Sequence, residues 1–163
     1  MKMFPTTRSE LIDNLINFSE TELSNYSKNR NFDFGPPHKN VSKLSPYLRT
    51  RFISEEEVLK IAISRNNIKN IEKFIEEIFW RTYWKGWLET HPWIYEEYLN
   101  KSKNQLLPKK TGIKCFDYWK EELLDTGYLH NHSRMWFASI WIFTLDYSWQ
   151  SGADFFKRNL LDF

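Results

Sequence analysis

The chain has 163 residues, with 23 Lys and Arg against 21 Asp and Glu, so its formal net charge at pH 7 is only +2. This near balance does not by itself indicate nucleic-acid binding, because basic domains of that class carry a larger excess. The single cysteine, Cys115, excludes an internal disulfide and is typical of a reducing compartment. No apolar run approaches the roughly 20 residues of a membrane-spanning helix. We therefore expect a cytoplasmic protein without membrane contact, folded as one domain over residues 1–163.

Aromatic residues make up 18 % of the chain, with 8 Trp, 8 Tyr and 13 Phe. This fraction has two interpretations that composition alone does not separate. The rings can fill the core, or some of them can stack on a planar ligand or on nucleic-acid bases.

Apolar residues recur at helical spacing along the chain, whereas alternating strand patterns are absent. Thr7-x-x-Glu10 and Ser54-x-x-Glu57 are capping boxes that predict helix starts, and Gly127 predicts a helix end. The fold class that follows is all-α, as an orthogonal helical bundle. We expect helices over about residues 7–18, 20–27, 54–65, 67–89, 92–100, 114–125, 133–145 and 151–160, with loops over 31–43 and 102–112.

The segment that follows Gly127 has the most unusual composition. A polar turn, residues 130–134, leads into an apolar run, residues 135–145, that predicts a helix buried on every side. Polar side chains at the start of such a helix favour a buried site for a polar ligand. His130 and His132 point to different sides of a helix, so we predict no metal site.

Residues elsewhere also bear on possible sites. Glu77, Trp80, Arg81 and Trp84 share one face of the helix predicted over residues 67–89. This face is either a surface Glu–Arg pair beside half-buried rings or the wall of a ligand pocket. The remaining histidines, at positions 38 and 91, are expected in solvated loops.

Motifs in several parts of the chain follow one another with sensible gaps. They are Ser42-Lys43-Leu44-Ser45-Pro46-Tyr47-Leu48, Phe74-x-x-Glu77-x-x-Trp80-Arg81, Thr111-Gly112 to Tyr118, Gly127-Tyr128-Leu129-His130-Asn131-x-x-Arg134-Met135-x-x-Ala138-Ser139, and Trp149 with Phe155-Phe156 and Asp162. Together they resemble the cryptochrome/DNA photolyase family over about residues 26–163. The resemblance implies the family's helical domain, which holds FAD.

The resemblance also implies roles for individual residues. Tyr26, Ser42, Leu44 and Ser45 would hold the phosphates and ribose. Arg134 would pair with Asp162 beside the isoalloxazine ring. The full set implied to bind FAD is Tyr26, Ser42, Leu44, Ser45, Phe74, Arg81, Asn131, Arg134 and Asp162.

The family's activity is light-driven electron transfer from flavin, which repairs cyclobutane pyrimidine dimers in DNA. The residues that would face a flipped dimer are Glu77, Trp80, Asn131 and Met135. Trp149 matches the middle tryptophan of the family's electron-transfer chain. The implied partner is therefore DNA that contains a pyrimidine dimer.

Departures from the family pattern leave alternatives open. The family's antenna domain and the flavin-contacting residues that follow the position of Phe163 have no counterpart in the sequence given. One alternative is a non-catalytic, cryptochrome-like flavin- or DNA-binding subunit whose protein partner supplies the C-terminal segment. A truncated relic is another. A third is a flavin-free DNA-binding remnant that uses Trp80 and the lysine-rich loop, with Lys101, Lys103, Lys109, Lys110 and Lys114.

Overall fold

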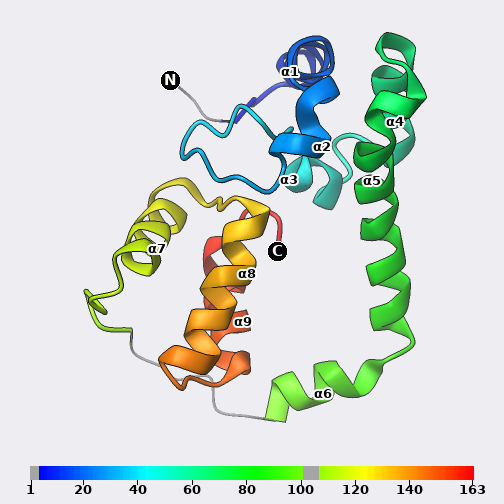
Figure 1. Cartoon of the computed structure of the whole chain (residues 1–163). Helices are drawn as coiled ribbons and strands as arrows, with labels where there is room; N and C mark the ends of the chain where they lie inside the picture. Colours follow the sequence, from blue (N-terminus) through cyan, green and yellow to red (C-terminus); the bar gives the residue numbers. More distant parts are fainter. Residues whose placement is uncertain (1–3, 101–106) are drawn as a thin grey trace. The chain divides into compact units, whose positions relative to one another are not determined.

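The computed structural model describes residues 4–100 and 107–163 (Figure 1). These residues form helices and loops and contain no strand, which confirms the all-α class. Their contacts cluster into two compact units, Met1–Glu89 and Thr90–Phe163, which are described separately below. The expectation of one domain over the whole chain stays a prediction. Lys101 and Lys103 of the lysine-rich loop lie outside the described residues.

The first unit contains the helices expected over about residues 7–18, 54–65 and 67–89. The one expected over 20–27 is instead divided into a 3₁₀ turn and a short helix, and a short helix over residues 45–49 was not expected. The elements are α1 (Arg8–Thr21), the 3₁₀ turn η1 (Leu23–Asn25), α2 (Tyr26–Asn29), α3 (Ser45–Arg49), α4 (Glu55–Arg65) and α5 (Ile68–Glu89). Both expected capping boxes are present. Thr7 caps α1 with Glu10 returning a bond to the cap backbone, and Ser54 with Glu57 does the same for α4.

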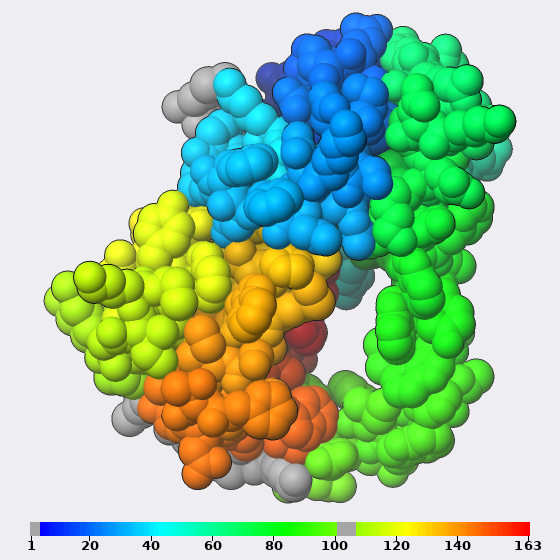
Figure 2. Space-filling model, viewed as in Figure 1, coloured from blue at the N-terminus to red at the C-terminus, as the bar shows by residue number. Residues whose placement is uncertain are grey.

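One apolar core holds the first unit together. It is built from α1, α3, α4 and α5, and Ile71, Phe74 and Ile78 supply the buried stripe of α5. The C-terminal half of α5 (green, Figure 2) differs, because Phe79, Trp80, Tyr83 and Trp84 are exposed there. The core therefore fixes only the first half of this helix.

The second unit is built around stacked aromatic rings. Its helices are α6 (Pro92–Asn100), α7 (Lys114–Thr126), α8 (Asn131–Ser139), the π-helical turn η2 (Ile140–Thr144) and α9 (Trp149–Asn159). Phe116 of α7 stacks on Phe137 of α8 with ring centroids 4.2 Å apart, and Trp141 and Phe155 complete the cluster. Gly127 ends α7 at φ 69°, as expected, and its carbonyl accepts the Leu161 N–H.

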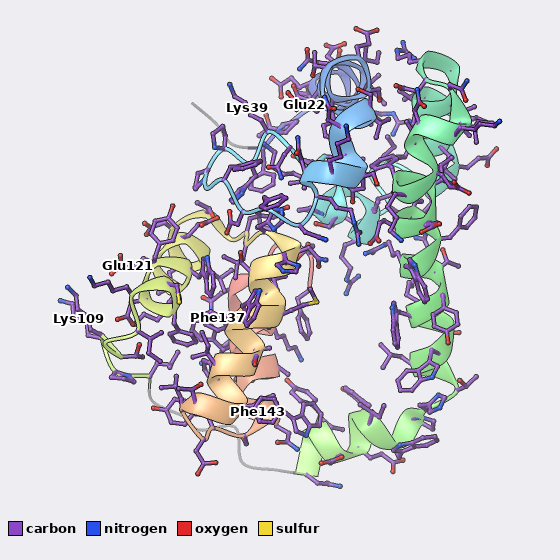
Figure 3. The ribbon with its side chains drawn as sticks, viewed as in Figure 1. Glu22, Lys39, Lys109, Glu121, Phe137 and Phe143 are labelled. Carbon is purple, nitrogen blue, oxygen red and sulfur yellow. The ribbon has the colours of Figure 1, made fainter. Side chains whose placement is uncertain are left out.

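The expectation of a helix buried on every side over residues 133–145 is wrong. The helix begins at Asn131, and its last turn is π-helical. Phe137 lies inside the ring cluster, whereas Phe143 is 82 % exposed at the end of the segment (Figure 3). Met135 is exposed as well. An apolar composition predicts burial of a helix but does not determine which of its faces meets a neighbour.

The expectation for the loop histidines is wrong for His38 and holds only in part for His91. His38 is completely buried, with its Nδ1 3.3 Å from the Asp33 carboxylate. His91 is half-buried, and its ring lies 4.6 Å from the ring of Trp93. The burial of His38 depends on how residues 31–43 fold back on themselves, which helical periodicity does not report.

Candidate functional site

The start of α8 is arranged by the residues that follow Gly127. The chain turns there and buries Tyr128, Leu129 and His130. The Nδ1 atom of His130 accepts the backbone N–H of His132 at 3.2 Å, so this buried imidazole is the N-cap of α8. Its role as a cap places Asn131 at the first, exposed position of the helix.

Arg134 and Asp162 form a two-point ion pair in the second unit. The Arg134 Nη1 and Nη2 atoms donate to the two carboxylate oxygens of Asp162, each at 3.0 Å, and Nε donates to the Leu129 carbonyl at 2.8 Å. The Asp162 side chain is 3 % exposed and that of Arg134 is 21 % exposed. The expected pairing is therefore present, and the Arg134 side chain is still partly exposed.

Two further sequence-predicted residues lie beside this pair on α8. Asn131 and Met135 are both exposed and stand one helical turn apart, on either side of Arg134 in the sequence. An amide, a thioether and a guanidinium therefore share one end of the helix. This set can bind a planar polar ring through hydrogen bonds and apolar contact.

Trp149 lies at the start of α9 and contacts α6. Its ring centroid is 6.3 Å from that of Tyr98, and its Nε1 donates to Glu97 at 3.4 Å. The same Glu97 oxygen accepts the side-chain amide of buried Gln150 at 3.2 Å. Trp149 is half-buried, and sequence periodicity gave no sign of these contacts.

In the first unit, Glu77 forms an ion pair with Arg30 of the segment after α2. Tyr26 lies beside this pair, with its ring edge-on to Phe74 at 5.3 Å. Burial raises the pKa of the Tyr26 hydroxyl, and the Glu77 charge raises it further. Sequence reasoning missed Arg30, which lies 47 positions from Glu77 and outside every motif.

Arg81 does not pair with Glu77, so the interpretation of a surface Glu–Arg pair one turn apart is wrong. Its Nε atom lies 3.5 Å from the Glu55 carboxylate, is buried, and has no hydrogen-bond partner among the described residues. Trp80 and Trp84, by contrast, are exposed and stack with ring centroids 6.3 Å apart. This side of α5 therefore offers an N–H group without a hydrogen bond, on a guanidinium whose charge is paired with Glu55, and open ring surface.

The segment that leads into α3 carries the remaining predicted residues. The Leu44 side chain is buried in the core and fixes the local backbone. Ser42 and Ser45 are half-buried, and within the part of the chain that the structure describes their hydroxyls have no hydrogen-bond partner. Hydroxyl groups held in this way can donate to phosphate oxygens. Phe74 is itself buried and acts by supporting the Tyr26 ring.

Residues 4–100 and 107–163 contain no cluster of His, Cys, Asp and Glu with the arrangement of a metal site. None of the helices there is long and apolar enough to cross a membrane.

Comparison with known proteins identifies the family. A family model described as the FAD binding domain of DNA photolyase matches residues 74–163. The chain belongs to the DNA photolyase family. A deoxyribodipyrimidine photo-lyase of Neurospora crassa is 26 % identical over 98 % of this chain and 29 % of its own length. One of Alkalihalophilus pseudofirmus is 32 % identical over 90 % of the chain and 33 % of its own length.

Further relatives agree with this assignment. A cryptochrome DASH of Danio rerio is 29 % identical over 86 % of the chain and 30 % of its own length. The crystal structure of a bacterial class III photolyase from Agrobacterium tumefaciens superposes with a TM-score of 0.74 at 26 % identity, over 95 % of this chain and 35 % of that one. The chain thus spans about a third of the length of these relatives.

FAD is the cofactor of the photolyase family domain. The residues present fit its chemistry. The unpaired Ser42 and Ser45 hydroxyls suit phosphate or ribose oxygens, and the buried Arg81 Nε is a donor still lacking an acceptor. Arg134 offers a guanidinium already oriented by Asp162. The individual contacts to FAD stay predictions.

Proposed function

We propose that this chain binds FAD and takes part in light-driven repair of cyclobutane pyrimidine dimers in DNA, in the cytoplasm. Membership of the photolyase family supports the reaction class. The observation that carries the proposal is the two-point Arg134–Asp162 pair beside exposed Asn131 and Met135. A guanidinium oriented in this way stabilises negative charge on a neighbouring ring.

Each residue would contribute binding or electrostatics. FAD, when bound in its reduced form, supplies the light-excited electron that splits the dimer and takes it back. Ser42 and Ser45 donate to phosphate and ribose oxygens, and Arg81 gives its buried Nε to an acceptor. Asp162 holds the Arg134 guanidinium in one orientation, which would place its positive charge near the flavin.

The dimer would be bound by the residues that stay accessible. Trp80 is exposed, and its ring offers a surface on which a flipped base stacks. Glu77 forms an ion pair with Arg30 and presents a carboxyl group that can hydrogen-bond to a thymine ring. Asn131 and Met135 supply an amide and an apolar contact from α8.

Absorption spectroscopy with added FAD tests the cofactor, and a repair assay tests the reaction. We expect a resolved flavin band near about 450 nm, a property of protein-bound oxidised flavin, and dimer loss under blue light. Glu77→Gln should lower repair and leave bound flavin unchanged. The control is Glu76→Gln, one position away, where the carboxylate pairs with Lys73 at the surface. Equal repair in the two variants would contradict the role of Glu77.

A second candidate is a subunit that completes its site with a partner protein. The exposed rings on the C-terminal half of α5, namely Phe79, Trp80, Tyr83 and Trp84, favour it, since such contiguous surfaces mark interaction sites. This candidate predicts a protein that stays colourless with FAD alone. A flavin band without any added protein would rule it out.

A further inference from the structure

The loop between α2 and α3 carries a pair of exposed, parallel aromatic rings. Phe32 is 58 % exposed and Phe34 is 66 % exposed. Their ring centroids lie 6.0 Å apart, and the ring planes differ by 12°. Two apolar rings in contact with each other and with water leave an outer ring face open to another planar group.

Hydrogen bonds hold this loop in one conformation. The Asp33 carboxylate accepts the Gly35 N–H at 2.9 Å and lies 3.3 Å from Nδ1 of buried His38. The side-chain amide of buried Asn40 donates to the carbonyl oxygens of Phe32 and of the last residue of α2, each at 2.9 Å. The rings therefore stand on a backbone that is already ordered, which lowers the entropic cost of binding.

The charge around the rings is positive. Residues 28–43 contain Lys28, Arg30, Lys39 and Lys43 and one acidic residue, Asp33. Because Arg30 pairs with Glu77, the remaining formal excess is two positive charges. Lys28 and Lys39 are exposed and make no ion pair with any described residue. Figure 3 shows Lys39. Asp33 bonds within the loop and makes no ion pair with either lysine.

We propose that Phe32 and Phe34 form a stacking platform for a base of single-stranded nucleic acid, with Lys28 and Lys39 contacting its phosphates. Open rings and unpaired cations in one short segment are the combination that single-strand-binding proteins use, because every base has a face that stacks. A protein partner would need a larger apolar surface than two rings. This platform goes beyond the proposed dimer site, whose residues lie on other elements.

Fluorescence anisotropy with a labelled, undamaged thymidine strand of about twelve nucleotides tests the platform in the full chain. Phe34→Leu keeps an apolar side chain but removes the ring, and we expect affinity to fall about 5- to 150-fold. Phe34→Tyr should bind the strand as the wild-type chain does, because it keeps an aromatic ring at this position. Phe143→Leu is the control, since Phe143 is an exposed ring without this loop around it. Lys39→Gln should reduce the slope of log affinity against log salt by about 0.7.

Circular dichroism of each variant checks that the helices are retained, which is expected because these side chains are exposed. The proposal is overturned if the wild-type chain does not bind the strand, or if Phe34→Leu binds as wild type. It is also overturned if Phe143→Leu loses as much affinity, or if Phe34→Tyr binds as weakly as Phe34→Leu. No dimer, flavin or light is used, so failure here is distinct from failure of the repair function.

Discussion

Replacing Arg134 by Ala tests whether the ion pair at the start of α8 holds the second unit together. The change removes two bonds to Asp162 and one to the Leu129 carbonyl, and it leaves a carboxylate that is 3 % exposed without its cation. Breaking a buried pair from one side costs about 3–5 kcal/mol. Because the Arg134 side chain is 21 % exposed, water can partly solvate Asp162 in the variant, and we expect the free energy of unfolding to fall by about 2–3 kcal/mol.

A second Arg–Asp pair in the same unit provides the matched control. Arg158 and Asp154 lie one turn apart on α9, with the Arg158 Nη2 atom 2.8 Å from Asp154 Oδ2, but the Arg158 side chain is 63 % exposed. Solvent screens such a pair, so Arg158→Ala should cost no more than about 0.5 kcal/mol. The contrast separates the effect of burial from the effect of removing any arginine.

Urea unfolding without added FAD measures both variants. A loss of 2–3 kcal/mol shifts the midpoint by about 1 M or more for a small protein. Arg134→Ala should also fail to develop the flavin band, whereas Arg158→Ala should retain it. A stable Arg134→Ala protein that binds FAD normally would refute both the structural and the cofactor role of the pair.

Two further predictions concern backbone conformation and pH. Gly127 has φ 69°, and the Cβ added by Gly127→Ala would lie 2.8 Å from the Leu161 side chain. Gly112 has φ 84° but an added Cβ meets no atom there, so Gly112→Ala should lower the free energy of unfolding by only about 1 kcal/mol through backbone strain, and Gly127→Ala should lower it more. Equal urea midpoints for the two variants would contradict this. Burial raises the pKa of Tyr47, whose hydroxyl donates to the Pro5 carbonyl, to about 12. Because the unfolded state loses this proton near pH 10, stability should fall from pH 10 to 12, and Tyr47→Phe should flatten that fall in melting experiments.

Features that depend only on neighbouring residues could be predicted from the amino-acid sequence. The capping boxes at Thr7 and Ser54 start helices without help from distant parts of the chain, because each cap side chain bonds to a backbone N–H three positions away. The left-handed turn at Gly127 is equally local. The order of the motifs along the chain also predicted two features that are not local, namely the family and the pairing of Arg134 with Asp162.

Contacts between side chains far apart in the sequence became visible only in the folded chain. Glu77 pairs with Arg30 and not with Arg81, and His38 is buried because the loop closes on Asp33. Phe143 is exposed although its segment is among the most apolar in the chain. Periodicity predicts the side of a helix on which a residue lies. Which element covers that side depends on packing between elements that are distant in the sequence.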